Sequence, residues 1–144
     1  MQHGTNVVAL IGGHLLHYAD GTFRTSTFND FHNPHGMFGD RIRGEAAAIL
    51  YQQNPLDTSV MVLGGVTPLH KTFPDAPHLS TVVTQELIAL GTPEAVIEEV
   101  DLDPDCGSFK QLWHLAQRIR DLATVCQIRT VTLLSNFWQI PRLF

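Results

Sequence analysis

The chain has 144 residues, of which 44% are hydrophobic and 16% charged, a composition that can fill the core of one globular domain. Its formal net charge is −5, and its nine Lys and Arg residues form no basic stripe for a phosphate backbone. The apolar runs are too short to cross a bilayer, and the chain does not start with a signal-like segment. We therefore expect one cytoplasmic domain over residues 1–144, with no nucleic-acid partner and no membrane span.

The cysteines and histidines do not follow a metal-binding pattern. Cys106 and Cys126 lack CxxC spacing, so we interpret them as packing residues or free thiols. The eight histidines include two pairs spaced three apart, but there is no HExxH motif and no clear carboxylate partner. We expect neither a disulfide framework nor a metal site.

The first predicted strand is residues 6–11, a short apolar run. It ends at Gly12, Gly13 and His14, where glycine allows a ligand or another backbone to approach closely. Residues 15–40 show no sustained periodicity and are rich in His, Asn, Gly and Phe, so we expect a long irregular loop.

From residue 41 onward, predicted helices and strands alternate. We expect a helix over 41–53, a strand over 59–63, a helix over about 80–90, a strand over 95–100, a helix that Ser108 and Gln111 open with a capping box, and a strand over 130–134. Such alternation with short connections predicts a parallel sheet of at least four strands with helices on both faces.

Four polar or glycine-rich segments directly follow the predicted strands. They are Gly12 to His14, Gly64 to Thr67, Glu98 to Asp101 and Ser135 to Trp138. In a parallel sheet these segments share one edge, and ligands of open α/β folds bind outside the carboxyl ends of the strands. The ordinary alternative for each segment is a tight turn or a solvated acidic group.

Several familiar catalytic motifs are absent from the sequence. It has no phosphate-cradling G-x-x-x-x-G-K-[ST] loop and no dinucleotide-binding G-x-G-x-x-G. It also has no G-x-S-x-G nucleophile elbow. Kinase, dehydrogenase and α/β-hydrolase functions therefore lose their strongest support.

The C-terminal segment combines a strand end with the start of a helix. Pro141 suits the first turn of a helix, and Arg142 beside it is a cation available to an anionic ligand. Because the chain stops two residues later, we expect a domain that lacks its C-terminal helix or helices. Such a domain would expose Leu133, Phe137 or Leu143 to water.

The ordered set of motifs resembles the YdcF-like family of bacterial proteins, which includes SanA and ElyC and is largely described as a domain of unknown function. The matching stretches run in family order over nearly the whole chain: Arg43 to Tyr51 (R-x-x-x-A-x-x-L-Y), Val62 to Gly65, Leu87 to Pro93, Glu98-Glu99, and Leu134 to Arg142.

This resemblance implies a Rossmann-like three-layer α/β/α fold with a mainly parallel sheet and a pocket over the strand ends. A family member has been linked to S-adenosylmethionine binding and others to maintenance of the cell envelope. Carried over by position, the residues around that pocket are Arg43, Gly64, Gly65, Glu99, Ser135 and Arg142. Trp138 stands where the family usually has a histidine, which removes the obvious general acid or base.

Each of these residues also has an ordinary structural interpretation. Arg43 could pair with Glu45 or Glu99, although the resemblance favours a place beside a solvent-facing cleft with little effect on folding. Ser135 could cap a helix or bind a ligand oxygen. Trp138 could cover the sheet edge or provide a stacking platform for a planar group.

We therefore predict a domain that binds a small anionic or nucleotide-like metabolite such as S-adenosylmethionine. The expected ligand-binding residues are Gly12, Gly13, His14, Arg43, Gly64, Gly65, Ser135, Asn136, Trp138 and Arg142. One alternative is an enzyme acting on a phosphate-containing or cell-envelope precursor, with Glu99 as the base. Strand alternation favours Glu99 over Glu98 for this role. Another alternative is a degenerate scaffold that acts through a protein partner.

Overall fold

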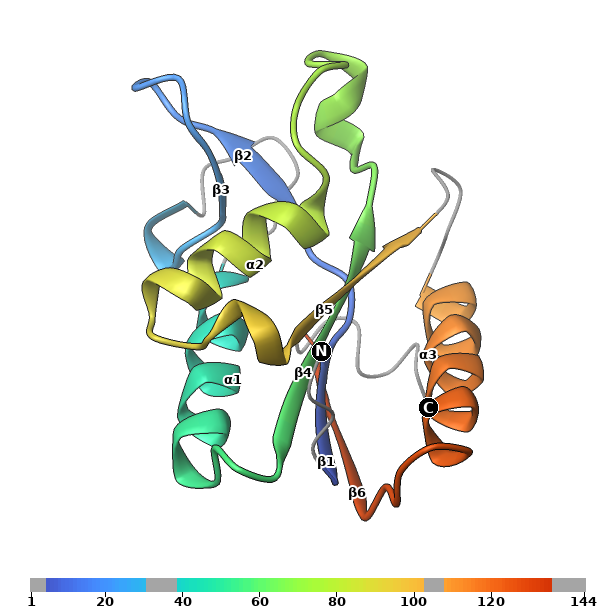
Figure 1. The fold of residues 1–144 in the computed structure, drawn as a ribbon. Helices are drawn as coiled ribbons and strands as arrows, with labels where there is room; N and C mark the ends of the chain where they lie inside the picture. The colour runs from blue at the N-terminus through green and yellow to red at the C-terminus, as the bar shows by residue number, and fades with distance from the viewer. Residues whose placement is uncertain (1–4, 31–38, 103–107, 136–144) are drawn as a thin grey trace.

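A computed structural model describes residues 5–30, 39–102 and 108–135, and its centre is a four-stranded parallel sheet (Figure 1). The strands are β1 (Asn6–Leu10), β4 (Thr58–Gly65), β5 (Ile97–Leu102) and β6 (Thr130–Leu134), in the spatial order β5-β4-β1-β6. β1 lies at the centre and pairs with β4 on one side and β6 on the other. Such central strands are buried on both faces, which explains why β1 and β4 read as continuous apolar runs.

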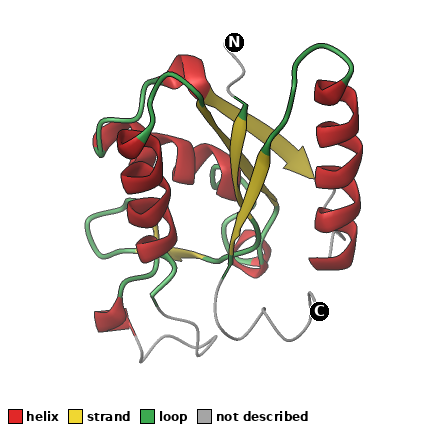
Figure 2. Ribbon diagram, turned by 90° about the horizontal axis from the view of Figure 1, so that it is seen from below, coloured by secondary structure: helices red, strands yellow, loops and turns green. Residues whose placement is uncertain are grey.

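Helices cover both faces of this sheet. Helices α1 (Arg41–Gln53) and α2 (Leu79–Ala89) lie on one face and α3 (Ser108–Ala123) on the other, as Figures 1 and 2 show. Alternate residues of β1 point to the two faces: Val8 and Leu10 pack in the core with α1 and α2, and Val7 and Ala9 pack in the core with α3. The predicted Rossmann-like three-layer fold is confirmed.

The order of the strands reverses at β1. Counted in chain order, the four strands of the sheet lie in the order 3-2-1-4, because the chain builds outward from β1 to β5 and then returns to place β6 on the other side of β1. In open α/β folds, the crevice at such a reversal is the usual place for a ligand. Here it lies between the carboxyl ends of β1 and β6.

Residues 15–30 are more regular than the sequence suggested. They form an antiparallel hairpin of β2 (Leu15–His17) and β3 (Phe23–Thr25), followed by a single 3-10 turn, η1 (Phe28–Asp30). The prediction of an irregular loop over this part is wrong, because strands of three residues are too short to show alternation. Long-range contacts hold the hairpin: the carboxylate of Glu86 on α2 accepts hydrogen bonds from the N–H and the hydroxyl of Thr25, at 3.0 and 2.6 Å.

Most of the remaining element boundaries match the predictions closely, but the ends of β4 and β5 differ from them. The helix over 41–53 and the strand over 130–134 are confirmed, and Gly91 follows α2 with φ 94°, as a C-cap glycine should. However, a 3-10 turn, η3 (Glu94–Val96), takes the place of the expected start of the third strand, so β5 runs two residues further than predicted. Another 3-10 turn, η2 (Pro68–Lys71), precedes α2.

The outer strand β6 is partly open to water on its α3 side. Val131 is 39% exposed and Leu133 is 36% exposed. The expected exposure of Leu133 is confirmed, whereas Phe137 and Leu143 lie outside the described residues. Within residues 5–30, 39–102 and 108–135, none of the helices has the length and apolar character needed to cross a membrane.

Candidate functional site

The candidate site is the loop that follows β1, residues 11–14, which we call the strand-end loop. It lies at the reversal of strand order, and the N–H of Ile11 extends the β1–β6 pairing by donating to the carbonyl of Leu134 at 3.0 Å. Gly12 and Gly13 have φ values of 73° and 125°, which L side chains rarely adopt. The two glycines therefore allow the chain to turn sharply at the end of β1.

Arg43 of α1 binds this loop from the face of the sheet that α1 covers. Its side chain is only 4% exposed, and Nη1 donates to the carbonyls of Ile11 at 2.8 Å and Gly12 at 2.6 Å. Nε donates to the carbonyl of Asp40 at 3.2 Å. Burial lowers the pKa of the guanidinium, while the nearby carboxylates of Asp40 and Glu86 act in the opposite direction. The expected place of Arg43 beside a solvent-facing cleft is wrong, because its guanidinium satisfies carbonyls inside the protein.

Asp40 holds the other end of the loop. It is 1% exposed, and its Oδ2 accepts a hydrogen bond from the N–H of His14 at 2.7 Å. Asp40 occupies the N-cap position of α1, yet its side chain makes no capping bond to that helix. Its Oδ1 lies 4.0 Å from Nε of Arg43, so the two buried charges offset each other.

Two further side chains reach the loop from α3 and from the end of β6. The N–H of Gly12 donates to Oε1 of Gln111 at 2.8 Å, and the hydroxyl of Ser135 donates to the carbonyl of Ile11 at 3.3 Å. Gln111 belongs to α3, which covers the opposite face of the sheet from α1. The loop is thus held from both faces of the sheet.

These contacts leave one main-chain donor of the loop available. The N–H groups of Gly12 and His14 are bound to side chains, whereas we find no hydrogen bond to the N–H of Gly13 from any residue the structure describes. Gly13 and His14 are both half-buried. An amide donor of this kind, held in a rigid loop beside an imidazole, can bind an oxygen atom of a ligand.

The predicted glycines of the neighbouring strand have a packing role. Gly64 and Gly65 are the last two residues of β4 rather than a loop after it, and both are buried. A Cβ added to Gly64 would lie 3.0 Å from the side chain of Leu79, at the start of α2. Gly64 therefore allows α2 to pack closely against the end of β4, beside β1.

Glu99 is not brought together with the strand-end loop. It lies inside β5, opposite Val62, and β4 separates β5 from β1. Its side chain is exposed and accepts a hydrogen bond from the hydroxyl of Thr81 on α2 at 3.1 Å. Glu98 pairs with Arg118 of α3 on the other face, so the expected alternation is confirmed, but the expectation that these acids follow the strand is wrong.

The structure thus gathers part of the predicted site. Gly12, Gly13, His14, Arg43 and Ser135 meet at the ends of β1 and β6. Asn136, Trp138 and Arg142 lie outside the described residues, so their predicted roles stay predictions. Sequence reasoning missed Asp40 as a loop-binding residue and read Gln111 only as part of a helix cap. The available signal for Asp40 was its spacing of three from Arg43 at the start of a helix.

Among the residues that the structure describes, no three His, Cys, Asp or Glu side chains cluster as metal ligands. No protein-family model matches the chain, and comparisons with curated proteins and with solved structures find no significant match. The resemblance to the YdcF-like family is therefore still a prediction.

Proposed function

We propose that the domain binds a small anionic or nucleotide-like metabolite at the strand-end loop. The observation that supports this most directly is the position of the loop at the reversal of strand order, between the carboxyl ends of β1 and β6. S-adenosylmethionine is the first candidate, because a member of the family that the chain resembles has been linked to it.

The loop supports this proposal through its rigidity. Four side chains from separate parts of the chain fix its main chain: Asp40, Arg43, Gln111 and Ser135. A loop fixed in this way loses little conformational entropy when a ligand binds. In this proposal the N–H of Gly13 donates to the ligand, and the hydroxyl oxygen of Ser135, whose proton goes to the carbonyl of Ile11, accepts from it. Arg43 acts as a positioning residue.

The enzyme alternative gains less support. Its predicted base, Glu99, is a solvent-exposed residue of β5 on the α2 side of the sheet. β5 lies two strands away from β1. A general base must come within hydrogen-bond reach of the proton that it removes. Among the described carboxylates, the structure shows a hydrogen bond to the loop from the buried Asp40, which accepts from the N–H of His14.

Calorimetric titration of S-adenosylmethionine and of adenosine monophosphate tests the proposal. The variant is Ser135→Ala, which removes one hydroxyl at the site. Its matched control is Thr130→Ala, which removes a hydroxyl at the opposite end of β6, where Thr130 donates to Asn6 at 2.8 Å. A neutral hydrogen bond contributes about 0.5 to 1.5 kcal/mol, so Ser135→Ala should weaken binding about threefold to tenfold.

Each result of this titration has a definite meaning. Saturable binding that Ser135→Ala weakens and Thr130→Ala leaves unchanged supports the proposed site. Absence of heat with the wild-type protein at millimolar ligand rejects both named ligands. Equal binding by all three proteins rejects the contact with Ser135 and places the ligand elsewhere.

A further inference from the structure

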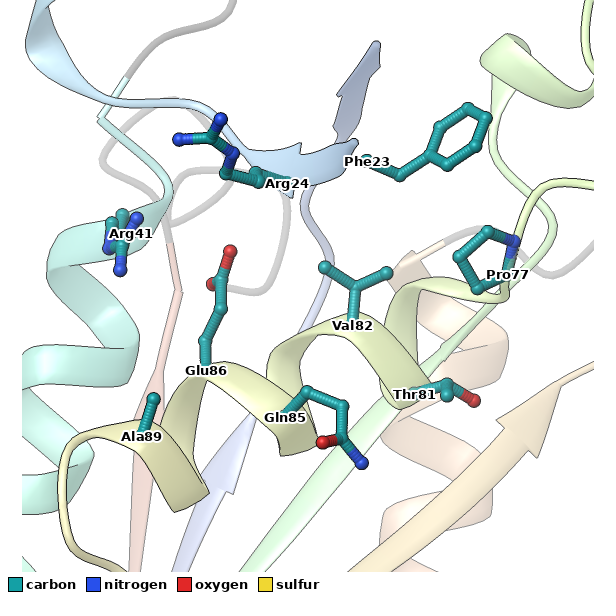
Figure 3. Close-up of a pocket in the computed structure, with 9 residues that line it drawn as sticks. All are labelled: Phe23, Arg24, Arg41, Pro77, Thr81, Val82, Gln85, Glu86 and Ala89. Carbon is teal, nitrogen blue, oxygen red and sulfur yellow. The ribbon is translucent and has the colours of Figure 1, made fainter. Parts of the chain in front are cut away.

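A second candidate site lies away from the strand-end loop, between the β2–β3 hairpin and α2. It is a pocket of about 340 Å³, and we call it the hairpin pocket (Figure 3). Its lining includes Phe23, Arg24, Arg41, Val82, Glu86 and Ala89. This volume is at the lower end of the range for small-molecule sites.

One wall of the hairpin pocket is apolar and held in place. Val82 extends from α2 towards Phe23 of β3 across the pocket (Figure 3). The ring of Phe23 packs against the rings of His17 and Phe73, at centroid distances of 5.0 and 5.6 Å, and these contacts restrict its position. A supported aromatic ring opposite an aliphatic side chain suits a planar or apolar ligand body.

The charged groups of the pocket differ in how far they are already satisfied. Glu86 accepts two hydrogen bonds from Thr25, and Arg24 pairs with Asp20 and lies 4.5 Å over the ring of Tyr18. The guanidinium of Arg41, by contrast, has neither a hydrogen bond nor an ion pair with any residue in the described ranges. Arg41 is half-buried at the start of α1, beside the pocket.

We propose that the hairpin pocket binds a small organic anion with an apolar body. The apolar part packs between Phe23 and Val82, and the anionic group binds the guanidinium of Arg41, which offers the fork geometry that a carboxylate fits. Glu86 keeps its negative charge, but both of its oxygens already accept hydrogen bonds from Thr25.

Titration of the protein with 2-naphthoate, monitored by the NMR shifts of backbone amides, tests this site. Uncharged 2-naphthamide probes the apolar wall alone. The first variant is Arg41→Gln, which should preserve folding because it removes a cation from the first turn of a helix, where cations are unfavourable. Its control is Arg120→Gln, at a separate apolar pocket between α3 and β6. The second variant is Ala89→Leu, which fills the hairpin pocket from an exposed position.

The expected pattern separates charge from shape. Arg41→Gln should weaken the binding of 2-naphthoate about tenfold and leave the binding of 2-naphthamide unchanged. Ala89→Leu should weaken the binding of both compounds. Arg120→Gln should change neither. The proposal is overturned if the wild-type protein does not bind 2-naphthoate, if Arg41→Gln binds it equally well, or if Arg120→Gln weakens it as much as Arg41→Gln does.

Discussion

Gly13 lies directly against the guanidinium of Arg43. A Cβ added to Gly13 would overlap Nη2 of Arg43 and lie 3.2 Å from its Cζ, and the backbone there has φ 125°. The loop after β1 and the first turn of α1 are thus fitted to each other. The same arginine binds the carbonyls of Ile11 and Gly12, so the conformation of the loop and the position of Arg43 depend on each other.

Gly13→Ala should therefore destabilise the fold by about 3 kcal/mol or more, because backbone strain adds to a clash with a buried side chain. The control is Gly21→Ala, in the hairpin turn, where φ is 84° but no atom lies within 4 Å of the added Cβ. That change should cost only about 1 to 2 kcal/mol, from strain alone. Urea unfolding measures both, and equal costs would show that Arg43 does not restrict Gly13.

Arg43→Ala should lower the free energy of unfolding by about 3 to 5 kcal/mol. It removes a charged donor from two buried carbonyls and leaves Asp40 without the opposite charge nearby. Arg41→Ala, two residues earlier, should change stability by less than about 0.5 kcal/mol, because Arg41 makes no side-chain contact of this kind within the described chain. A cost below about 1 kcal/mol for Arg43→Ala in urea unfolding would contradict its structural role.

Gln111→Leu should expose the amide of Gly12 to exchange with solvent. Among the described residues, this N–H has one acceptor, Oε1 of Gln111. Its loss should speed hydrogen exchange at Gly12 about tenfold or more, since an unmade buried hydrogen bond costs about 1 to 3 kcal/mol. Gln117→Leu, on the same helix, is the control and should leave Gly12 unchanged. Unchanged exchange in both variants would mean that α3 does not hold the loop.

Tyr18→Phe should destabilise the protein at pH 7 by about 1 to 2 kcal/mol, because it removes a hydrogen bond of 2.6 Å to Asp30. Burial raises the pKa of Asp30, but the hydrogen bonds from Tyr18 and Thr27 outweigh it and lower that pKa. A carboxyl with a lowered pKa stabilises the fold above its unfolded pKa of about 3.9, and this contribution is lost as pH falls through the folded value.

The cost of Tyr18→Phe should therefore shrink as pH falls below about 4. Tyr51→Phe serves as the control, because the hydroxyl of Tyr51 makes no hydrogen bond to the residues described. Urea unfolding of the wild type and both variants at pH 7 and near pH 3.5 measures the difference. A cost for Tyr18→Phe that does not depend on pH would contradict the role of ionised Asp30.

The sequence was sufficient to predict the layers of the fold. Continuous apolar runs mark β1 and β4 as strands buried on both faces, and helix 41–53 ends before Asn54-Pro55 as expected. The hairpin over Leu15–Thr25 escaped prediction because its contacts are distant in sequence. One such contact is the bond from Thr25 to Glu86, which is 61 residues away.

The candidate site was predictable by position but not by role. Counting strand ends was enough to place Gly12, Gly13, His14 and Ser135 at one edge of the sheet. The direction in which Arg43 points depends on burial, which no local pattern encodes, and its predicted place at the pocket came from the family resemblance alone. The shift of β5 by two residues, caused by the 3-10 turn after Pro93, misplaced Glu99.

The central claim is that a metabolite binds at the reversal of strand order, and amide NMR mapping with S-adenosylmethionine tests it most directly. We predict saturable shifts at Gly12, Gly13, His14 and Ser135, all with one dissociation constant. Shifts confined to the hairpin pocket around Arg41 and Gln85, or no shifts up to millimolar ligand, would contradict the account.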